Sequence, residues 1–133
     1  MSEKADLTSL TKVLDDLKRA GRVLIAVLYG SHAKGTPHKR SDIDLALFIK
    51  GRNEMEEIEI IDSILVSVDG DLAILRLDDE DESPFVVQEA LKGTHLVDPD
   101  KDALYSVHDR VLHEAENIRF RKELRIGQKE KAV

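Results

Sequence analysis

Two aspartates, Asp42 and Asp44, stand two residues apart at the start of the apolar run SDIDLALFI. Side chains alternate between the two faces of a strand, so both carboxylates are expected to point from the same face. Two carboxylates placed together repel each other, and a divalent cation with oxygen ligands removes that repulsion. Mg²⁺ is typically held by one or two carboxylates together with the phosphates of a substrate. The pair therefore predicts a magnesium site.

A second motif precedes these aspartates along the chain. The apolar run VLIAVLYG ends at Gly30-Ser31, which predicts a buried strand that opens into a tight turn or a short helix. A glycine at the end of a strand lets backbone N–H groups approach an anion closely. Gly30 and Ser31 are therefore candidate phosphate-binding residues. A phosphate-binding turn beside a metal-holding pair is what phosphoryl or nucleotidyl transfer requires.

Each of these residues also has a simpler interpretation. Asp42 and Asp44 would face solvent if their strand lay at a sheet edge, but the apolar residues that follow them predict burial on both faces. Unpaired carboxylates beside such a core are costly, so a metal explains them better. Lys34 and Arg40 lie in the loop between the motifs, where cations reach triphosphate oxygens, with a solvated basic loop as the alternative.

The two motifs together carry a family resemblance. The sequence GSHAKG at 30–35, followed by SDIDL at 41–45, resembles the signature of the DNA polymerase β-like nucleotidyltransferases. The short chain further resembles the minimal nucleotidyltransferases, which are the antitoxins of HEPN/MNT toxin–antitoxin modules. The resemblance extends over about residues 23–99. It implies a third metal-binding acid on the neighbouring strand, and Asp71 falls there, although Asp71 follows Gly70 and also suits an ordinary turn.

This resemblance also implies an activity. The chain is expected to use Mg²⁺ and ATP to transfer AMP to a hydroxyl, by analogy a tyrosine of a HEPN-domain ribonuclease toxin encoded beside it. Asp42, Asp44 and Asp71 would be catalytic and metal-binding, and Gly30, Ser31, Lys34 and Arg40 would bind the nucleotide. Two alternatives stay open. One is a small-molecule adenylyltransferase of the antibiotic-modifying type, and the other is an antitoxin that acts by binding alone.

Length and composition limit the class of protein. The 133 residues fit one domain, with a core over about 5–99 and a C-terminal helix over about 101–126. A composition of 41% hydrophobic and 35% charged residues is typical of a soluble globular protein. The sequence contains no apolar run long enough for a membrane helix and no signal-peptide pattern, so we expect a cytoplasmic protein. The absence of cysteine excludes disulfides and thiolate metal sites.

Charge is distributed unevenly along the chain. The formal net charge of -7 argues against direct binding of long nucleic acids, which depends on clustered Lys and Arg. Residues 119–131 nevertheless hold six basic side chains against Glu123 and Glu130. This basic segment suits RNA, an acidic partner, or simply a solvated helix end. We expect the C-terminal helix to contribute to a homo- or hetero-oligomer.

Hydrophobic periodicity predicts the remaining elements. An amphipathic helix is expected over about 5–20, ending at Gly21, and a second begins after Asn53. The buried stripe of that second helix is predicted to be Met55, Ile58, Ile61 and Leu65. A strand over 71–75, a helix from Ser83-Pro84 to Gly93, an edge strand over 94–97 and a long helix from about Lys101 follow. This alternation predicts an α/β or α+β domain, a small mixed sheet flanked by helices.

Overall fold

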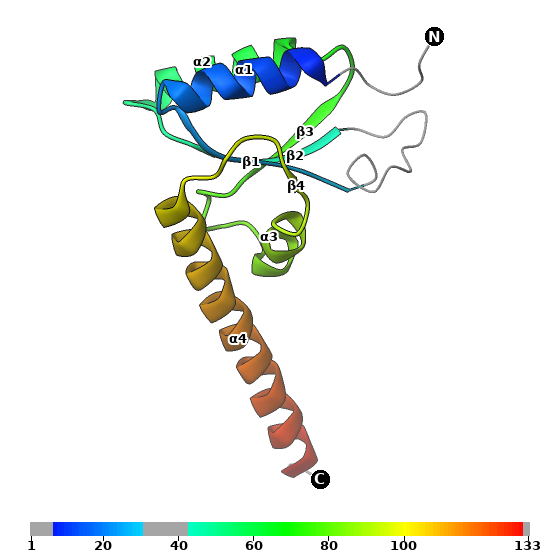
Figure 1. Ribbon diagram of the computed structural model, residues 1–133. Helices are drawn as coiled ribbons and strands as arrows, with labels where there is room; N and C mark the ends of the chain where they lie inside the picture. Colours follow the sequence, from blue (N-terminus) through cyan, green and yellow to red (C-terminus); the bar gives the residue numbers. More distant parts are fainter. Residues whose placement is uncertain (1–6, 31–42, 132–133) are drawn as a thin grey trace.

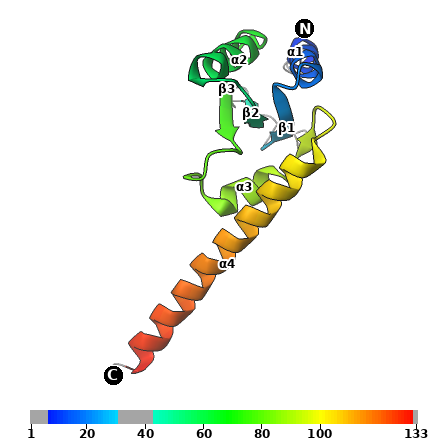
Figure 2. The same ribbon diagram turned by 90° about the vertical axis from the view of Figure 1, so that its left-hand side faces the viewer.

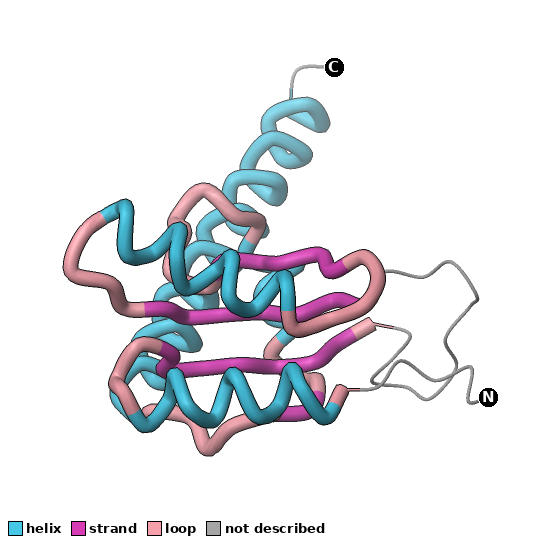
Figure 3. Tube along the Cα trace, turned by 90° about the horizontal axis from the view of Figure 1, so that it is seen from above, coloured by secondary structure: helices cyan, strands magenta, loops and turns pink. Residues whose placement is uncertain are grey.

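A four-stranded mixed sheet with helices on both faces organises the chain (Figures 1 and 3). This computed structural model describes residues 7–30 and 43–131. The strands are β1 (Val23–Tyr29), β2 (Ile43–Ile49), β3 (Leu72–Arg76) and β4 (Thr94–His95), in the spatial order β3-β2-β1-β4. β1 is antiparallel to β2 and β4, whereas β2 and β3 are parallel. The predicted fold, a small mixed sheet flanked by helices, is confirmed.

The two faces of the sheet carry separate cores. α1 (Thr8–Arg19) and α2 (Glu54–Val66) lie side by side over one face, as Figure 3 shows, and α3 (Pro84–Ala90) and α4 (Lys101–Lys131) cover the other. Leu45 and Leu47 of β2 pack into the α1/α2 core, whereas Ala46 packs against α3 and α4. β2 is therefore buried on both faces. This explains why its sequence is a continuous apolar run instead of an alternating one.

α1 ends as its sequence predicts. Gly21 follows the C-cap residue Ala20 and has a φ of 74°, in the left-handed region that glycine adopts without steric cost. Its N–H donates to the Lys18 carbonyl at 3.0 Å, and the Arg22 N–H donates to the Leu17 carbonyl at 2.8 Å. This pair of bonds is a Schellman motif, which satisfies the last carbonyls of the helix. The chain then turns directly into β1.

The predicted buried stripe of α2 is wrong, although the helix itself is confirmed. Asn53 caps it as expected, accepting a hydrogen bond from the Glu56 N–H at 2.9 Å. The buried residues are Ile60 and Ile64, whereas Met55, Ile58 and Leu65 are exposed and Ile61 is half-buried. Apolar residues surround much of α2, so periodicity did not identify the face that the sheet covers.

The C-terminal elements follow the expected order with different limits. Ser83 stands at the N-cap of α3 without a side-chain capping bond, and α3 ends at Ala90. β4 is shorter than expected. α4 begins at Lys101 and continues to Lys131, beyond the expected end near 126. Val107 and Val111 are buried in the core beneath the sheet, whereas Ile118 is exposed because α4 extends away from the sheet (Figure 2).

None of the helices within the described ranges is both long and apolar enough to cross a membrane.

Candidate active site

Three of the predicted site residues fall within the described structure. Gly30 follows β1, Asp44 belongs to β2, and Asp71 directly precedes β3. All three lie at one end of the sheet, where β1 ends and the parallel strands β2 and β3 begin, on the right-hand side of Figure 1. The predictions for Ser31, Lys34, Arg40 and Asp42 concern residues outside the described ranges.

Gly30 and Asp44 are in direct contact. The antiparallel register of β1 and β2 pairs Tyr29 with Asp44, which brings the next residue, Gly30, against the Asp44 side chain. A β-carbon on Gly30 would collide with the Asp44 carboxylate. Gly30 also has a φ of 75°, a conformation that other residues adopt only at a cost. Glycine is therefore required here both by the turn and by the close approach of the carboxylate.

Asp71 joins the same end of the sheet through β3. Its carbonyl accepts a hydrogen bond from the Ile43 N–H at 3.1 Å, one residue before the parallel pairs Ile43↔Leu72 and Asp44↔Ala73. Ile43 and Leu72 pack on the α1/α2 core, so Asp44 lies on the opposite face of the sheet. Continuing the same alternation backwards along β3 assigns Asp71 to the face of Asp44. The Asp71 side chain is exposed.

These residues provide suitable chemistry for a divalent cation. Asp44 is only half-buried, and its carboxylate oxygens lie beside a backbone that has no side chain at Gly30. Carboxylate oxygens are the ligands that Mg²⁺ prefers. Among the side chains that the structure describes, within 7–30 and 43–119, no group of three or more acidic, His or Cys residues could hold a metal. Asp42, the other member of the predicted pair, lies outside those ranges.

Tyr29 is a site residue that the sequence reasoning missed. Its half-buried ring packs on the α3/α4 core, and it is the strand partner of Asp44. Burial raises the pKa of the Tyr29 hydroxyl, and the negative charges of Asp44 and Glu82 raise it further. The phenol is therefore held neutral, as a hydrogen-bond donor, near two carboxylates. In the sequence, the signal that could have identified Tyr29 was its position immediately before Gly30.

Gly93 helps to position this end of β1. A β-carbon on Gly93 would collide with the Leu28 carbonyl and would lie 3.0 Å from the β-carbon of Tyr29. The turn after α3 therefore packs directly on the β1 backbone, beside the strand that carries Tyr29 and Gly30. The sequence indicated Gly93 only as the end of a helix.

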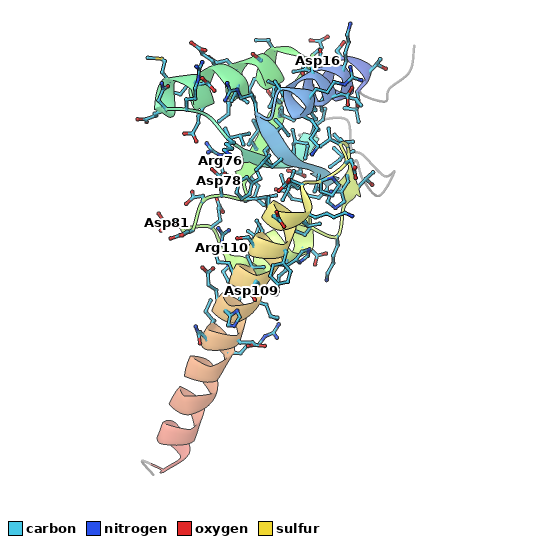
Figure 4. All side chains as sticks on the ribbon, turned by 60° about the vertical axis from the view of Figure 1, so that its left-hand side comes forward. Asp16, Arg76, Asp78, Asp81, Asp109 and Arg110 are labelled. Atoms are coloured by element: carbon cyan, nitrogen blue, oxygen red, sulfur yellow. The ribbon has the colours of Figure 1, made fainter. Side chains whose placement is uncertain are left out.

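Arginines at the opposite end of the sheet make structural contacts. Arg76, the last residue of β3, pairs with Asp78 at 2.6 Å and with Glu57 of α2 at 3.6 Å. Arg110 of α4 donates to the Leu77 carbonyl at 2.6 Å. Figure 4 shows Arg76 and Asp78 side by side, with Arg110 below them on α4. These guanidinium groups hold β3, α2 and α4 together at the end of the sheet away from Asp44.

Comparison with known proteins gives a family match. The family profile described as "Polymerase beta, Nucleotidyltransferase" matches residues 11–102. No curated protein sequence shows a significant match.

Solved structures share the fold at low sequence identity. A toxin–antitoxin structure with AMP-PNP has a TM-score of 0.62 and 18% identity, covering 90% of this chain and 98% of the other. A mutant of the MntA–HpeT toxin–antitoxin gives 0.63 and 19%, covering 94% and 98%. The MntA–HepT toxin–antitoxin gives 0.58 and 14%, covering 94% and 99%. With its glycine and aspartate in contact at the end of a mixed sheet and a family match over most of its length, this chain belongs to the polymerase beta nucleotidyltransferase family.

Proposed function

We propose that this protein is a Mg²⁺-dependent adenylyltransferase that transfers AMP from ATP to a hydroxyl group of a partner toxin and thereby acts as an antitoxin. The observation that carries the proposal is the contact between Gly30 and the Asp44 carboxylate, in a chain of the nucleotidyltransferase family. That contact would put a candidate metal ligand directly beside a candidate phosphate-binding turn.

The proposed roles follow from the chemistry of each residue. Asp42 and Asp44 would hold Mg²⁺, with Asp71 as a further ligand or as the base that accepts the proton of the attacking hydroxyl. The backbone of Gly30 and the Ser31 hydroxyl would donate to the β- and γ-phosphates, with Lys34 and Arg40 as cationic contacts. Bound Mg²⁺ would neutralise the triphosphate and increase the electrophilicity of the α-phosphorus.

The reaction is a displacement at the α-phosphorus. The acceptor oxygen forms a bond to that phosphorus, the bond to the bridging oxygen of the β-phosphate breaks, and pyrophosphate leaves with the electron pair. The acceptor proton passes to a carboxylate of the site or to water. The chain's own contribution would be to hold the Asp44 carboxylate against Gly30 through the register of β1 and β2, which would help to align the attack.

A toxin is the proposed acceptor because the similar structures are toxin–antitoxin complexes, one of them with the ATP analogue AMP-PNP. We propose a HEPN-domain ribonuclease with an acceptor tyrosine. If the protein were instead a small-molecule adenylyltransferase, the acceptor of AMP would be a free metabolite or antibiotic and not this toxin.

Intact mass of a co-expressed partner tests the proposal. The chain would be produced together with the product of the adjacent gene, and each transferred AMP should add about 329 daltons to that partner. The added mass should disappear when Asp42 and Asp44 are both changed to Asn, because the metal-bound triphosphate is then lost. A matched control changes Asp16 and Asp81 to Asn, two exposed aspartates outside the site (Figure 4), and should leave the added mass unchanged.

Two results would contradict the proposal. If the double Asn variant binds and silences an unmodified partner as well as the native chain does, the protein is a binding-only antitoxin. If no partner gains mass and antibiotics or metabolites are adenylylated instead, the acceptor is a small molecule.

A further inference from the structure

α2 exposes apolar side chains that the fold does not use. Met55 is 66% exposed, Ile58 48%, Leu65 38% and Val66 83%. At 100° per residue these four positions lie within one side of the helix, next to the half-buried Ile61. This side is distinct from the buried side formed by Ile60 and Ile64. A group of large apolar residues on one exposed helix side is typical of an interaction surface.

Unpaired acidic residues lie among these apolar ones. Glu54, Glu59 and Asp62 are exposed, and within the described parts of the chain none of them forms an ion pair. Asp62 falls between Ile58 and Leu65 on the helix surface. α2 contains five acidic residues and no basic one. We call the set of Glu54, Met55, Ile58, Glu59, Asp62, Leu65 and Val66 the acidic α2 face.

The chemistry of this face defines what can cover it. A partner must present apolar side chains, and it must also supply cations, because desolvating unpaired carboxylates would otherwise oppose binding. The acidic α2 face of a second copy fails that requirement, since like charges would meet. A basic helix that also carries apolar residues meets it.

The chain itself contains such a helix. Residues 119–131 of α4 include Phe120, Leu124 and Ile126 among six basic residues, against two acidic ones. This distal α4 segment has the same number of residues as α2, which is 13, so each is roughly 20 Å long. Removing its net charge of +4 from the total of -7 leaves the rest of the chain at -11 (-7 minus +4). The two helices are therefore complementary in charge and matched in length.

The distal α4 segment does not reach the acidic α2 face of its own chain. α2 lies over one face of the sheet, whereas α4 packs on the other face and extends away from it. Figures 1 and 2 show α2 and the C-terminal end of α4 at opposite ends of the molecule. Arg119 of α4 lies over the Phe85 ring, at 5.6 Å from its centroid, and the distal segment continues beyond this point. Contact between the two helices requires a second chain.

We propose that the acidic α2 face binds the distal α4 segment of a second copy of this protein. The inference rests on the charge and exposure of α2 and on the basic composition of the segment, and it does not depend on the adenylyltransferase proposal. The positive net charge of the segment offsets the charges of Glu54, Glu59 and Asp62, and association buries Ile58, Leu65 and Val66. Reciprocal exchange would give a dimer, and one-way exchange would give longer assemblies.

Sedimentation of the full chain over a range of concentrations tests this proposal. Self-association is expected in about 0.05 M NaCl and should weaken at least about tenfold in about 0.5 M NaCl, because salt screens exposed ion pairs. Glu59→Lys/Asp62→Lys on α2, or Lys122→Glu/Arg125→Glu on the distal segment, should each weaken association at least about tenfold. Mixing these two variants should restore association, since each then offers the complement of the other.

Matched controls distinguish an effect of this surface from a general effect of net charge or of hydrophobicity. Asp98→Lys/Glu116→Lys changes the net charge by the same amount as the α2 variant, at exposed positions outside the face, and should leave association unchanged. Ile58→Ser/Val66→Ser should weaken association, whereas Tyr105→Ser/Leu112→Ser, at exposed α4 positions, should not.

The proposal is overturned if the native chain stays monomeric at every concentration and salt level. It is also overturned if both charge-reversal variants associate normally. A third contrary result would be a monomeric native chain that binds a toxin and loses this binding in the α2 variant. The acidic α2 face would then bind the toxin instead of a second copy. AMP transfer by the same preparations is measured separately, so its loss and the loss of association are independent results.

Discussion

Gly30 and Gly21 offer a matched test of the site, because they have nearly the same φ and different surroundings. Gly21 has a φ of 74° and Gly30 a φ of 75°. A β-carbon at Gly21 would meet nothing within 4 Å, whereas one at Gly30 would collide with the Asp44 carboxylate. Alanine at either position should therefore have the same backbone strain, and only Gly30→Ala should disturb the site.

The expected size of the effect follows from the backbone strain and from the collision with the Asp44 carboxylate. A left-handed alanine costs roughly 1–2 kcal/mol, so each variant should melt about 3–10 °C below the native chain. In Gly30→Ala the Asp44 carboxylate must also retreat by about 1 Å to reach ordinary van der Waals contact. A displacement of about 1 Å in a reacting group lowers rates roughly 100-fold. Gly30→Ala should lose AMP transfer to that extent, whereas Gly21→Ala should remain active.

Thermal unfolding and transfer of labelled AMP, measured on both variants below their melting temperatures, check this prediction. The reasoning is refuted if Gly30→Ala keeps native activity, because Asp44 would then not need its position against Gly30. It is equally refuted if Gly21→Ala loses as much activity as Gly30→Ala, since backbone strain alone would then explain the loss.

Three further predictions follow from the same structure. Calorimetry should show ATP binding only with Mg²⁺ or Mn²⁺ and its loss in Asp44→Asn; equal affinity in EDTA would remove the proposed metal site. Ile64→Ala should destabilise the fold by about 2–4 kcal/mol, whereas Ile58→Ala should cost less than about 1 kcal/mol by urea unfolding; the reverse order would restore the stripe predicted from the sequence. A hydrogen bond from Arg52 holds the pKa of Glu56 below its ordinary value of 4.5, so the associated stability is complete above that value and is lost as pH falls through the lowered pKa. Native protein and Glu56→Gln should therefore differ in stability at about pH 7 and converge towards about pH 3, and a difference that persists in acid would contradict this.

The sequence determined the local features of this protein. The end of α1 at Gly21 depends on a backbone conformation that glycine adopts freely, and the start of α2 depends on Asn53, whose side chain reaches a backbone N–H three residues away. The continuous apolar run of β2 likewise predicted burial on both faces. Each of these signals lies in residues close together in the chain, so local pattern was sufficient to predict the feature.

Contacts between distant segments decided the rest. The apolar residues of α2 surround much of the helix, and only the sheet beneath it selected Ile60 and Ile64 for the core over Met55 and Ile58. Tyr29 was unremarkable in sequence until the β1/β2 register paired it with Asp44. That same register makes glycine necessary at position 30, because the carboxylate that would meet a β-carbon there belongs to another strand. Sequence periodicity indicates which residues can share a face, but long-range packing determines what that face meets.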